Sequence, residues 1–445
     1  MDLMLGNTED ALESKSVYTK QQQIAQLAAQ MPSAGLTSLA HHIDKVWLHE
    51  AYRRTRKDGA VGVDEVTATQ YEQELDSNLA KLLEHLKSGS YYAPPVKRVY
   101  IAKEGSGGAK RPIGIPTLED KVLQRSVVMA LSPLYEQDFL DCSYGFRPGR
   151  SAHQALEALW QAIMSMGGPC WVLEVDIKSY FDTVSHEHLR GFYKKRVRDG
   201  VILRILGKWL KAGVMMDGAL RYPGEGTPQG GVISPLLSNI YLHEVLDVWF
   251  TQQVRPRLKG RAELVRFADD FVIVFNQEAD ARRVMDVLPK RFERYGLTIH
   301  DQKTRLEGFS RPSGKGRGKS GSFAFLGFTH YWGKSRKGRW VVKRRTAKVK
   351  LKQAIRRVHR WCKKNRHLPV KEQQLHLHRK LHGHYGYYGI TFNTRSIKGY
   401  YEQVKRSWYK WLNRRSRDKQ LPWSRFNRLL ERYPLPRPRI VHQYS

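Results

Sequence analysis

Two adjacent aspartates stand between two apolar runs in the middle of the chain. Residues 264–267 read Leu-Val-Arg-Phe and residues 271–275 read Phe-Val-Ile-Val-Phe. Only an Ala-Asp-Asp segment, which holds Asp269 and Asp270, separates them. Such short runs of β-branched and aromatic residues predict the two strands of a hairpin. Two ionised carboxylates at its tip repel each other, and a divalent cation such as Mg²⁺ removes that cost. For an isolated pair, the alternative is a solvated Asp-Asp turn.

A third aspartate ends another predicted strand. Residues 171–175 read as a buried strand, and Asp176 follows directly. If that strand lies beside the hairpin, three carboxylates form a cluster. Such a cluster can hold two metal ions about 3.5–4 Å apart, the arrangement used for in-line nucleotidyl transfer. Taken alone, Asp176 is equally consistent with the N-cap of a helix.

A glycine-rich segment lies between these acidic positions in the sequence. Residues 224–235 read Gly-Glu-Gly-Thr-Pro-Gln-Gly-Gly-Val-Ile-Ser-Pro. Glycines let a backbone approach a base pair closely, and Gln229 could contact the template or the incoming nucleotide. On its own, the segment is also typical of a turn that caps a helix.

The charge balance indicates a polyanionic partner. The chain has 77 Lys and Arg against 42 Asp and Glu, a net charge of +35, and residues 341–445 contribute 29 of the former and 4 of the latter. The last quarter therefore carries most of the excess, and nucleic acid is the natural partner. A basic membrane-surface protein would need an amphipathic anchor helix or a lipid anchor, and the sequence indicates neither. At 41% hydrophobic residues, the composition excludes wholesale disorder.

Cysteine usage and the N-terminus point to a cytosolic protein. Cys142, Cys170 and Cys362 are far apart and form no CxxC pair, which argues against a zinc finger or a Cys-rich nuclease module. An odd, sparse count suits a reducing compartment. Residues 1–10 are acidic and unlike a signal peptide, and no apolar run approaches the roughly 20 residues of a membrane span.

Hydrophobic periodicity predicts helices, then a mixed α/β region, then basic helices. Two glycine-rich stretches stand out: residues 104–109 lie between strand-like runs and predict a hairpin tip, and residues 308–321 predict a flexible basic loop. The predicted helices are residues 36–52, 71–86, 232–250 (buried), 347–362, 372–384, 397–412 and 422–430.

The order of these motifs resembles a reverse transcriptase, and within that superfamily the bacterial group II intron-encoded reverse transcriptase/maturase family. Asp176 is followed by Tyr180-Phe181-Asp182, then by residues 228–240 (PQGGVISPLLSNI), then by residues 267–270 (FADD). Each motif is weak alone, but the ordered set is specific, and the match runs from about residue 36 to 440. Supporting segments are residues 62–64, 111–117, 120–124, 143–151, 296–297, 303–304 and 325–328.

The resemblance implies an α+β fold of the right-hand polymerase type. A helical N-terminal extension would span residues 1–95, fingers and palm residues 96–340, and a basic, all-helical thumb/maturase region residues 341–445. It also implies a bacterial, nucleic-acid-associated protein of the cytoplasm.

The same resemblance implies a set of reaction-site residues. Asp176, Asp269 and Asp270 would hold two Mg²⁺ ions, with Mn²⁺ as a substitute and Ile177 as a further ligand. Phe181 matches the aromatic residue that packs under the sugar and excludes a 2′-hydroxyl, with neighbouring Tyr180 as the fallback. The other implied nucleotide contacts are Lys103 and Arg111 (triphosphate), Gln229, and Lys303 (near the leaving pyrophosphate).

Nucleic-acid contacts are implied at further positions, among them a hairpin at residues 325–328 that supports the primer end. Lys and Arg would neutralise phosphates. Aromatic residues of the tail, such as Trp408 and Trp411, can stack on bases, although we expect many of them in the core of the thumb. The implied contact residues are Arg147, Arg150, Phe325, Leu326, Gly327, Lys343, Arg344, Arg345 and Lys348.

Two departures from the family pattern qualify the resemblance. Phe267 stands where the family usually has Tyr, which removes a hydroxyl but keeps the ring, and the C-terminal nuclease with its Cys pairs is absent. The leading hypothesis is an RNA-directed DNA polymerase that binds a group II intron RNA and assists its splicing and mobility. Its partners would be intron RNA, an RNA template with a DNA primer or target DNA, and dNTPs.

Two other functions stay open at this point. One is an RNA-binding splicing cofactor with a secondary polymerase role, and the other is a domesticated reverse transcriptase that acts in defence or repair.

Overall fold

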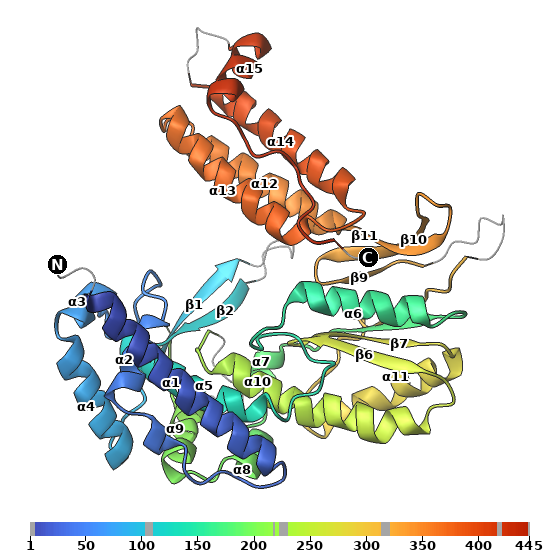
Figure 1. Ribbon diagram of the computed structural model, residues 1–445. Helices are drawn as coiled ribbons and strands as arrows, with labels where there is room; N and C mark the ends of the chain where they lie inside the picture. Colours follow the sequence, from blue (N-terminus) through green and yellow to red (C-terminus); the bar gives the residue numbers. More distant parts are fainter. Residues whose placement is uncertain are drawn as a thin grey trace.

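The computed structural model describes residues 5–102, 110–216, 219–221, 230–312, 321–415 and 421–443. It shows helices and small sheets arranged around a four-stranded central sheet, with a helical bundle standing above them (Figure 1). None of the described helices is both long and apolar enough to cross a bilayer.

The central sheet has the strand order β6-β7-β3-β8, and its neighbouring strands pair antiparallel. Successive side chains of a strand point to opposite faces, so both faces can be buried. Leu173 and Ile273 enter a core on the side of α11, whereas Val172 and Val274 enter a second core on the side of α6. The elements are β3 (Trp171–Val175), β6 (Ala262–Phe267), β7 (Asp270–Phe275), β8 (Arg305–Gly308), α6 (Ala152–Ser165) and α11 (Glu278–Glu293).

The N-terminal helices share one hydrophobic core with the helices around the sheet. Trp47 of α2 is fully buried, and its indole Nε1 donates to the carbonyl oxygen of Ser126 in α5, 3.0 Å away. The helices of this layer are α1 (Leu5–Gln30), α2 (Lys45–Arg53), α3 (Ala68–Gln73), α4 (Leu75–Ser88), α5 (Leu118–Tyr135), α8 (His186–Arg196) and α9 (Gly200–Lys211), with a short 3-10 turn at Ala40–His42.

The predicted helix at 36–52 is wrong in its first half. Asp44 accepts a hydrogen bond from the backbone N–H of Trp47 and so caps α2, which begins only at Lys45. The segment before it is held differently, because a carboxylate oxygen of Asp199 accepts from the backbone N–H groups of Leu39 and Ala40, each at 2.8 Å. A long-range hydrogen bond of this kind has no signal in local periodicity.

Two smaller sheets flank the central one. The order β2-β1-β4-β5 confirms the hairpin expected around residues 104–109, although that tip lies outside the described residues. The order β11-β10-β9 places a second hairpin above α6 (Figure 1). The strands are β1 (Val96–Ala102), β2 (Lys110–Ile115), β4 (Val214–Met216), β5 (Ala219–Arg221), β9 (Phe323–Phe325), β10 (Phe328–Lys334) and β11 (Trp340–Thr346).

The buried helix expected at 232–250 is confirmed, with an unforeseen change of winding. It begins as α10 (Ser234–Leu242) and continues through π-helical turns at His243–Asp247 and Trp249–Val254 to a 3-10 turn at Arg255–Arg257. Widened turns of this type are rare and are frequently found at functional sites.

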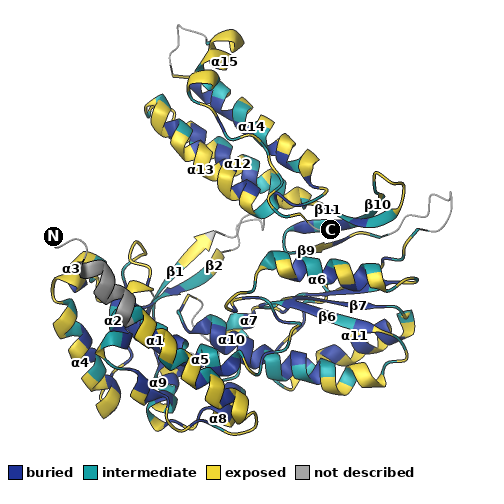
Figure 2. Cartoon of the chain, in the orientation of Figure 1, coloured by how far each residue is buried: buried dark blue, intermediate teal, exposed yellow. Residues whose placement is uncertain are grey.

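The C-terminal helices form a bundle with its own core. Its buried side chains include Trp408, Trp411 and Tyr385, which agrees with the expectation that many tail aromatics are core residues. Figure 2 shows buried residues along the inner faces of these helices and exposed residues outside. The helices are α12 (Lys348–Lys364), α13 (Val370–Tyr388), α14 (Thr394–Leu412) and α15 (Trp423–Arg432).

The expectation that residues 341–445 are all helical is wrong at its start. Lys343, Arg344 and Arg345 lie on strand β11, paired with Tyr331, His330 and Thr329 of β10. The alternating burial along β11 explains this, because Val342, Arg344 and Thr346 are buried. The many Lys and Arg residues of this segment hid the alternation of buried and exposed positions that is typical of a strand.

Candidate functional site

The strand register places Asp176 opposite Asp270. Strand β3 pairs with β7 up to Val175 and Phe271, and one further step along both chains brings the two aspartates together. Directly opposed residues have Cα atoms about 5 Å apart and side chains on the same face of the sheet. Asp269 occupies the turn between β6 and β7, next to Asp270. The topology thus brings the three predicted aspartates to one corner of the sheet.

A cavity of about 490 Å³ opens at this corner. Asp176 and Asp270 line it, and so do Lys303 and, from the start of α12, Lys350. Residues 325–327, the turn between β9 and β10, close another side. The pocket therefore combines carboxylates, ammonium groups and a hairpin from three separate parts of the chain.

The environment of the turn disfavours negative charge. The pKa of the Asp270 carboxyl is raised to about 6, first by the protein that surrounds it and then by the nearby charges of Asp269 and Asp176, while Lys350 and Arg111 lower it. The pKa of Asp269 is also raised, mainly by burial, with Asp176 adding to the rise. Asp270 remains open to solvent at the cavity, so an added cation can reach it.

A cation already pairs with one of the carboxylates. The Nζ of Lys303 lies 2.9 Å from Oδ2 of Asp176. Within the described ranges, no three Asp, Glu, His or Cys side chains converge tightly enough to hold one metal ion. The donor set nevertheless suits a hard divalent cation, because it consists of carboxylates that repel one another when ionised.

Ile177 is held by a bridge to a neighbouring segment. The hydrogen bonds of its antiparallel bridge to Ile299 are made by its neighbours: His300 N–H donates to the carbonyl of Asp176, and Lys178 N–H donates to the carbonyl of Thr298, each at 2.8 Å. The carbonyl of Ile177 is thus directed away from that strand.

The acidic turn adopts a backbone conformation that needs support. Ala268 has φ +57°, in the left-handed region that residues with a Cβ rarely occupy. Gly145 lies directly behind it: a Cβ on Gly145 would come within 2.3 Å of the Ala268 backbone nitrogen. A glycine is therefore required at position 145 for this segment to pack on the turn.

One buried arginine fastens the turn to the surrounding elements. Arg266 is fully buried, and its Nη1 donates to the Ala268 carbonyl and to Oδ1 of Asn239, both at 3.0 Å. Its Nε and Nη2 donate to Asp247, at 2.8 and 2.5 Å, and Nη2 also donates to Ser143 Oγ at 2.7 Å. All five guanidinium N–H groups thus have acceptors.

Sequence reasoning missed this network. Asp247 lies in the π-helical segment, and Asn239 donates to the carbonyl of Gly145 at 2.7 Å, so the network joins three distant parts of the chain. The available signal was an arginine between the apolar residues Val265 and Phe267 of a strand, since a buried charge needs a partner elsewhere.

The two candidate gate aromatics differ in accessibility. Tyr180 is buried, and its hydroxyl donates to the Ser238 carbonyl at 3.0 Å, so it is part of the core. Phe181 is half-buried and packs edge-on to Tyr180, with ring centroids 5.2 Å apart. Of the two, Phe181 is the ring with accessible surface.

Only some of the other predicted nucleotide contacts lie within the described residues. Arg111 is exposed on β2 and acts electrostatically on both Asp269 and Asp270. Lys103 and Gln229 lie outside the described residues. Gly230 follows Gln229 with φ +117°, and a Cβ there would lie 2.3 Å from the Gly114 carbonyl oxygen, so the glycine-rich segment ends against β2.

Two predicted nucleic-acid contacts turn out to be internal. Arg147 is buried, and it donates to Glu136 and to backbone carbonyls of residues 139–143. Arg344 is buried on β11. These guanidinium groups support the fold, and burial leaves them little surface for a phosphate.

The remaining predicted contacts lie nearer the surface. Arg150 pairs with Asp141 at 2.5 Å, and Arg345 and Lys348 are exposed. Lys343 is half-buried beside the ring of Phe392, and its Nζ lies 5.3 Å from the ring centroid.

The predicted contacts at residues 325–327 form the β9–β10 turn, which borders the acidic cavity. Phe325 is buried, and the Leu326 carbonyl accepts from Tyr387 Oη at 2.8 Å, which ties this turn to α13. Gly327 has φ +81°, as this tight turn requires.

The chain matches a described family over its central half. Residues 101–330 match the family described as "Reverse transcriptase (RNA-dependent DNA polymerase)".

Individual relatives extend this match. The chain is 39% identical over 287 residues to "Protein YkfC" of Escherichia coli, covering 57% of this chain and 74% of that protein. It is 42% identical over 184 residues to "Group II intron-encoded protein LtrA" of Lactococcus lactis, covering 41% of this chain and 30% of that one. It is 24% identical over 218 residues to "Nuclear intron maturase 3, mitochondrial" of Arabidopsis thaliana, covering 42% of this chain and 30% of that protein.

We expect loss of Arg266 alone to destabilise the chain and loss of its pair to cost less. Arg266→Met leaves the Asp247 carboxylate buried without its partner, which should lower the free energy of unfolding by about 3–5 kcal/mol. In the double variant Arg266→Met/Asp247→Leu the uncompensated charge is gone, so much of the loss should be recovered. Urea denaturation measures the wild type and both variants, and a double variant no more stable than Arg266→Met would contradict the account.

The raised pKa of Asp270 predicts a pH-dependent effect of its removal. The pKa of this carboxyl is about 6 in the folded chain and about 4 in the unfolded chain. The folded chain therefore binds the proton more tightly, and the free energy of unfolding falls as the pH rises from about 4 to about 6. With divalent metal ions removed by a chelator, the change in Tm caused by Asp270→Asn should therefore be more positive at pH 7.5 than at pH 4. Asp286→Asn, an exposed change on α11, is the control. An equal effect of Asp270→Asn at both pH values would contradict this explanation.

Proposed function

The chain belongs to the group II intron-encoded reverse transcriptase/maturase family, and from this premise we propose that it is an RNA-directed DNA polymerase that also assists the splicing and mobility of a group II intron. The observation that carries the proposal is the convergence of Asp176, Asp269 and Asp270 at one corner of the sheet, beside a cavity. Family membership alone does not establish activity, whereas this corner provides the chemical groups that nucleotidyl transfer requires.

We assign the metal site to the three aspartates, with the carbonyl of Ile177 as a further ligand. Two Mg²⁺ ions, or Mn²⁺ in their place, would supply Lewis acidity at the primer hydroxyl and the triphosphate. The raised pKa values of Asp269 and Asp270 support the assignment, because mutual repulsion contributes to them and an added cation relieves it. Lys303 would give up its contact with Asp176 and remain near the leaving pyrophosphate as a proton donor.

We assign the incoming nucleotide to the space between β2 and α7 (Tyr180–Thr183). Arg111 would grip the triphosphate, aided by Lys103, since a guanidinium can bind phosphate in a bidentate manner. Phe181 would pack under the sugar and exclude a 2′-hydroxyl, and Gln229 would contact the template or the nucleotide. The exposure of Phe181, compared with the buried Tyr180, favours it as the gate.

A right-hand layout follows from these assignments. Fingers and palm would occupy residues 96–340, after an N-terminal extension of residues 1–95, and the thumb/maturase region would occupy residues 341–445. The excess of cations in the last quarter, with Arg345 and Lys348 exposed at its start, supports contact with phosphates of a template–primer duplex and of intron RNA. The β9–β10 turn would support the primer end, since it borders the acidic cavity.

The alternative is an RNA-binding splicing cofactor with a secondary polymerase role. The basic bundle favours RNA binding under either function, whereas the retained trio of aspartates favours polymerisation. A domesticated reverse transcriptase in defence or repair would use the same site. It can be distinguished from an intron-encoded protein by whether the DNA that flanks the coding sequence encodes an intron RNA.

The direct test is primer extension on an RNA template with Mg²⁺ and dNTPs. Asp269→Asn removes a metal-binding charge, which should cost several kcal/mol of transition-state stabilisation and reduce the rate at least about a thousandfold. Asp286→Asn is the control for loss of a surface carboxylate. If the wild type and Asp269→Asn were equally inert while intron splicing was normal, the cofactor function would replace the polymerase.

The sugar gate is tested by nucleotide selectivity. Phe181→Ala opens space beside the sugar, so it should admit rNTPs at least about tenfold better relative to dNTPs, a change of about 1.4 kcal/mol in discrimination. Single-nucleotide incorporation of a dNTP and the matching rNTP measures the ratio. Unchanged selectivity would move the gate to another residue.

A further inference from the structure

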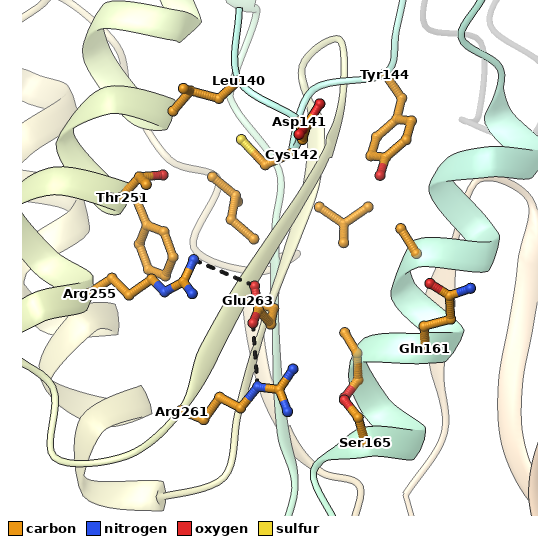
Figure 3. Close-up of a pocket in the computed structure, with 15 residues that line it drawn as sticks. Leu140, Asp141, Cys142, Tyr144, Gln161, Ser165, Thr251, Arg255, Arg261 and Glu263 are labelled. Carbon is orange, nitrogen blue, oxygen red and sulfur yellow. Dashed lines mark hydrogen bonds and ion pairs between the residues drawn. The ribbon is translucent and has the colours of Figure 1, made fainter.

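A second cavity, of about 580 Å³, lies alongside the start of β6 (Figure 3). The acidic turn lies beyond the other end of that strand. Helix α6 forms one wall, the π-helical segment with Phe250 and Thr251 forms another, and residues 140–144 lie across from them. The function proposed above makes no use of this cavity.

The outer edge of β6 is covered at one end and open at the other. Arg266 N–H donates to the Cys142 carbonyl at 2.8 Å, and the Arg266 carbonyl accepts from Tyr144 N–H at 2.9 Å. Backbone groups of an antiparallel strand alternate between its two edges, so Leu264 and Ala262 direct theirs to the same outer edge. No described residue provides a hydrogen-bond partner for these backbone groups of Leu264 or Ala262.

This open edge lies at the cavity rather than on a flat surface. Leu264 lines the cavity and is 6% exposed, and Ala262 is 1% exposed. Backbone N–H and C=O groups that are nearly buried need partners, and an unpaired strand edge is a template for another strand. The spacing of donors and acceptors suits an extended peptide backbone, which binds such edges by adding a strand.

The walls indicate what kind of side chains the added strand carries. The cavity volume leaves room for a side chain, and the apolar groups of Leu140, Ala158 and Ala162 in its lining favour an apolar one. At the rim, Arg255 and Arg261 share one carboxylate, that of Glu263, at 3.7 and 3.4 Å (Figure 3). Both arginines are exposed, and the other acidic residue of the lining, Asp141, pairs with Arg150 instead. Two cations on one anion therefore leave a positive charge for an acidic partner.

We propose that the open edge of β6 binds an extended, acidic peptide segment of a partner protein as an added strand, with an apolar side chain in the cavity. The Leu264 N–H donates to a peptide carbonyl and its carbonyl accepts from a peptide N–H. Carboxylates of the peptide pair with Arg255 and Arg261. Because the site lies apart from the acidic turn, the peptide binds without occupying the reaction site.

The probe is a fluorescein-labelled peptide of alternating Glu and Val, seven residues long, measured by fluorescence anisotropy with the full chain. Two further peptides carry N-methyl groups on alternate amides, one set on the odd and the other on the even positions. A docked strand uses only every second amide, so one methylated peptide should bind at least about tenfold more weakly than the other. Equal affinities of the two would overturn the proposal, because simple electrostatic attraction does not depend on which amides are free.

Variants of the chain test the cavity and the rim. Ala158→Trp fills the cavity, and the double variant Arg255→Glu/Arg261→Glu reverses the rim charge, so each should weaken the unmethylated peptide at least about tenfold. The double variant Arg257→Glu/Lys259→Glu makes the same charge change at exposed positions next to the site but outside the cavity lining, and it should have a smaller effect. Unchanged affinity in both test variants would contradict the proposal.

Two controls separate this site from the proposed polymerase. Thermal denaturation checks that each variant is folded, and primer extension should be unchanged in all of them. If single-stranded oligouridylate bound at this rim with the same sensitivity to the variants and the peptide did not bind, the site would be a nucleic-acid site and the proposal would fail.

Discussion

The position of the acidic turn depends on the buried guanidinium of Arg266. Its position is tightly fixed, because all five of its N–H groups have acceptors. These acceptors are the Ala268 carbonyl in the turn itself, Asn239 of α10, Asp247 of the π-helical segment and Ser143. An ionic pair with Asp247 that is fully buried adds little net stability over apolar residues, but it penalises any arrangement that separates the partners. The turn at Ala268, strained by its positive φ, is thereby kept in one conformation.

This support matters because the three aspartates repel one another. Asp176 is placed by the β3–β7 register, whereas Asp269 and Asp270 are placed by the turn, so no single element fixes the trio. Protein around Asp269 and Asp270 raises the pKa values of these two carboxyls, and the cations of Arg111 and Lys350 offset part of the cost. The chain thus brings these three aspartates together in one corner of a strongly basic molecule, where a metal ion and a phosphate chain can meet.

Much of this could be predicted from the sequence. The strands around Asp176, Asp269 and Asp270 were predictable because apolar β-rich runs end at those residues, and the basic helices because of their periodicity. The burial of Arg147 and Arg344 was not, since charge alone does not reveal an internal partner such as Glu136. The strand at Lys343 and the late start of α2 at Lys45 were missed because pairing with β10 and a hydrogen bond to Asp199 are long-range events.

The central claim, that the three aspartates form one metal site, is tested most directly by iron-mediated cleavage of the chain. Fe²⁺ that replaces the bound metal reduces added hydrogen peroxide to hydroxide and a hydroxyl radical, and added ascorbate returns the Fe³⁺ to Fe²⁺. The radicals cut the backbone close to the ion. Mass spectrometry of the fragments should show cuts near Asp176 and near Asp269 together, both suppressed by excess Mg²⁺. Cuts at one of these segments without the other, or cuts that Mg²⁺ does not suppress, would contradict the claim.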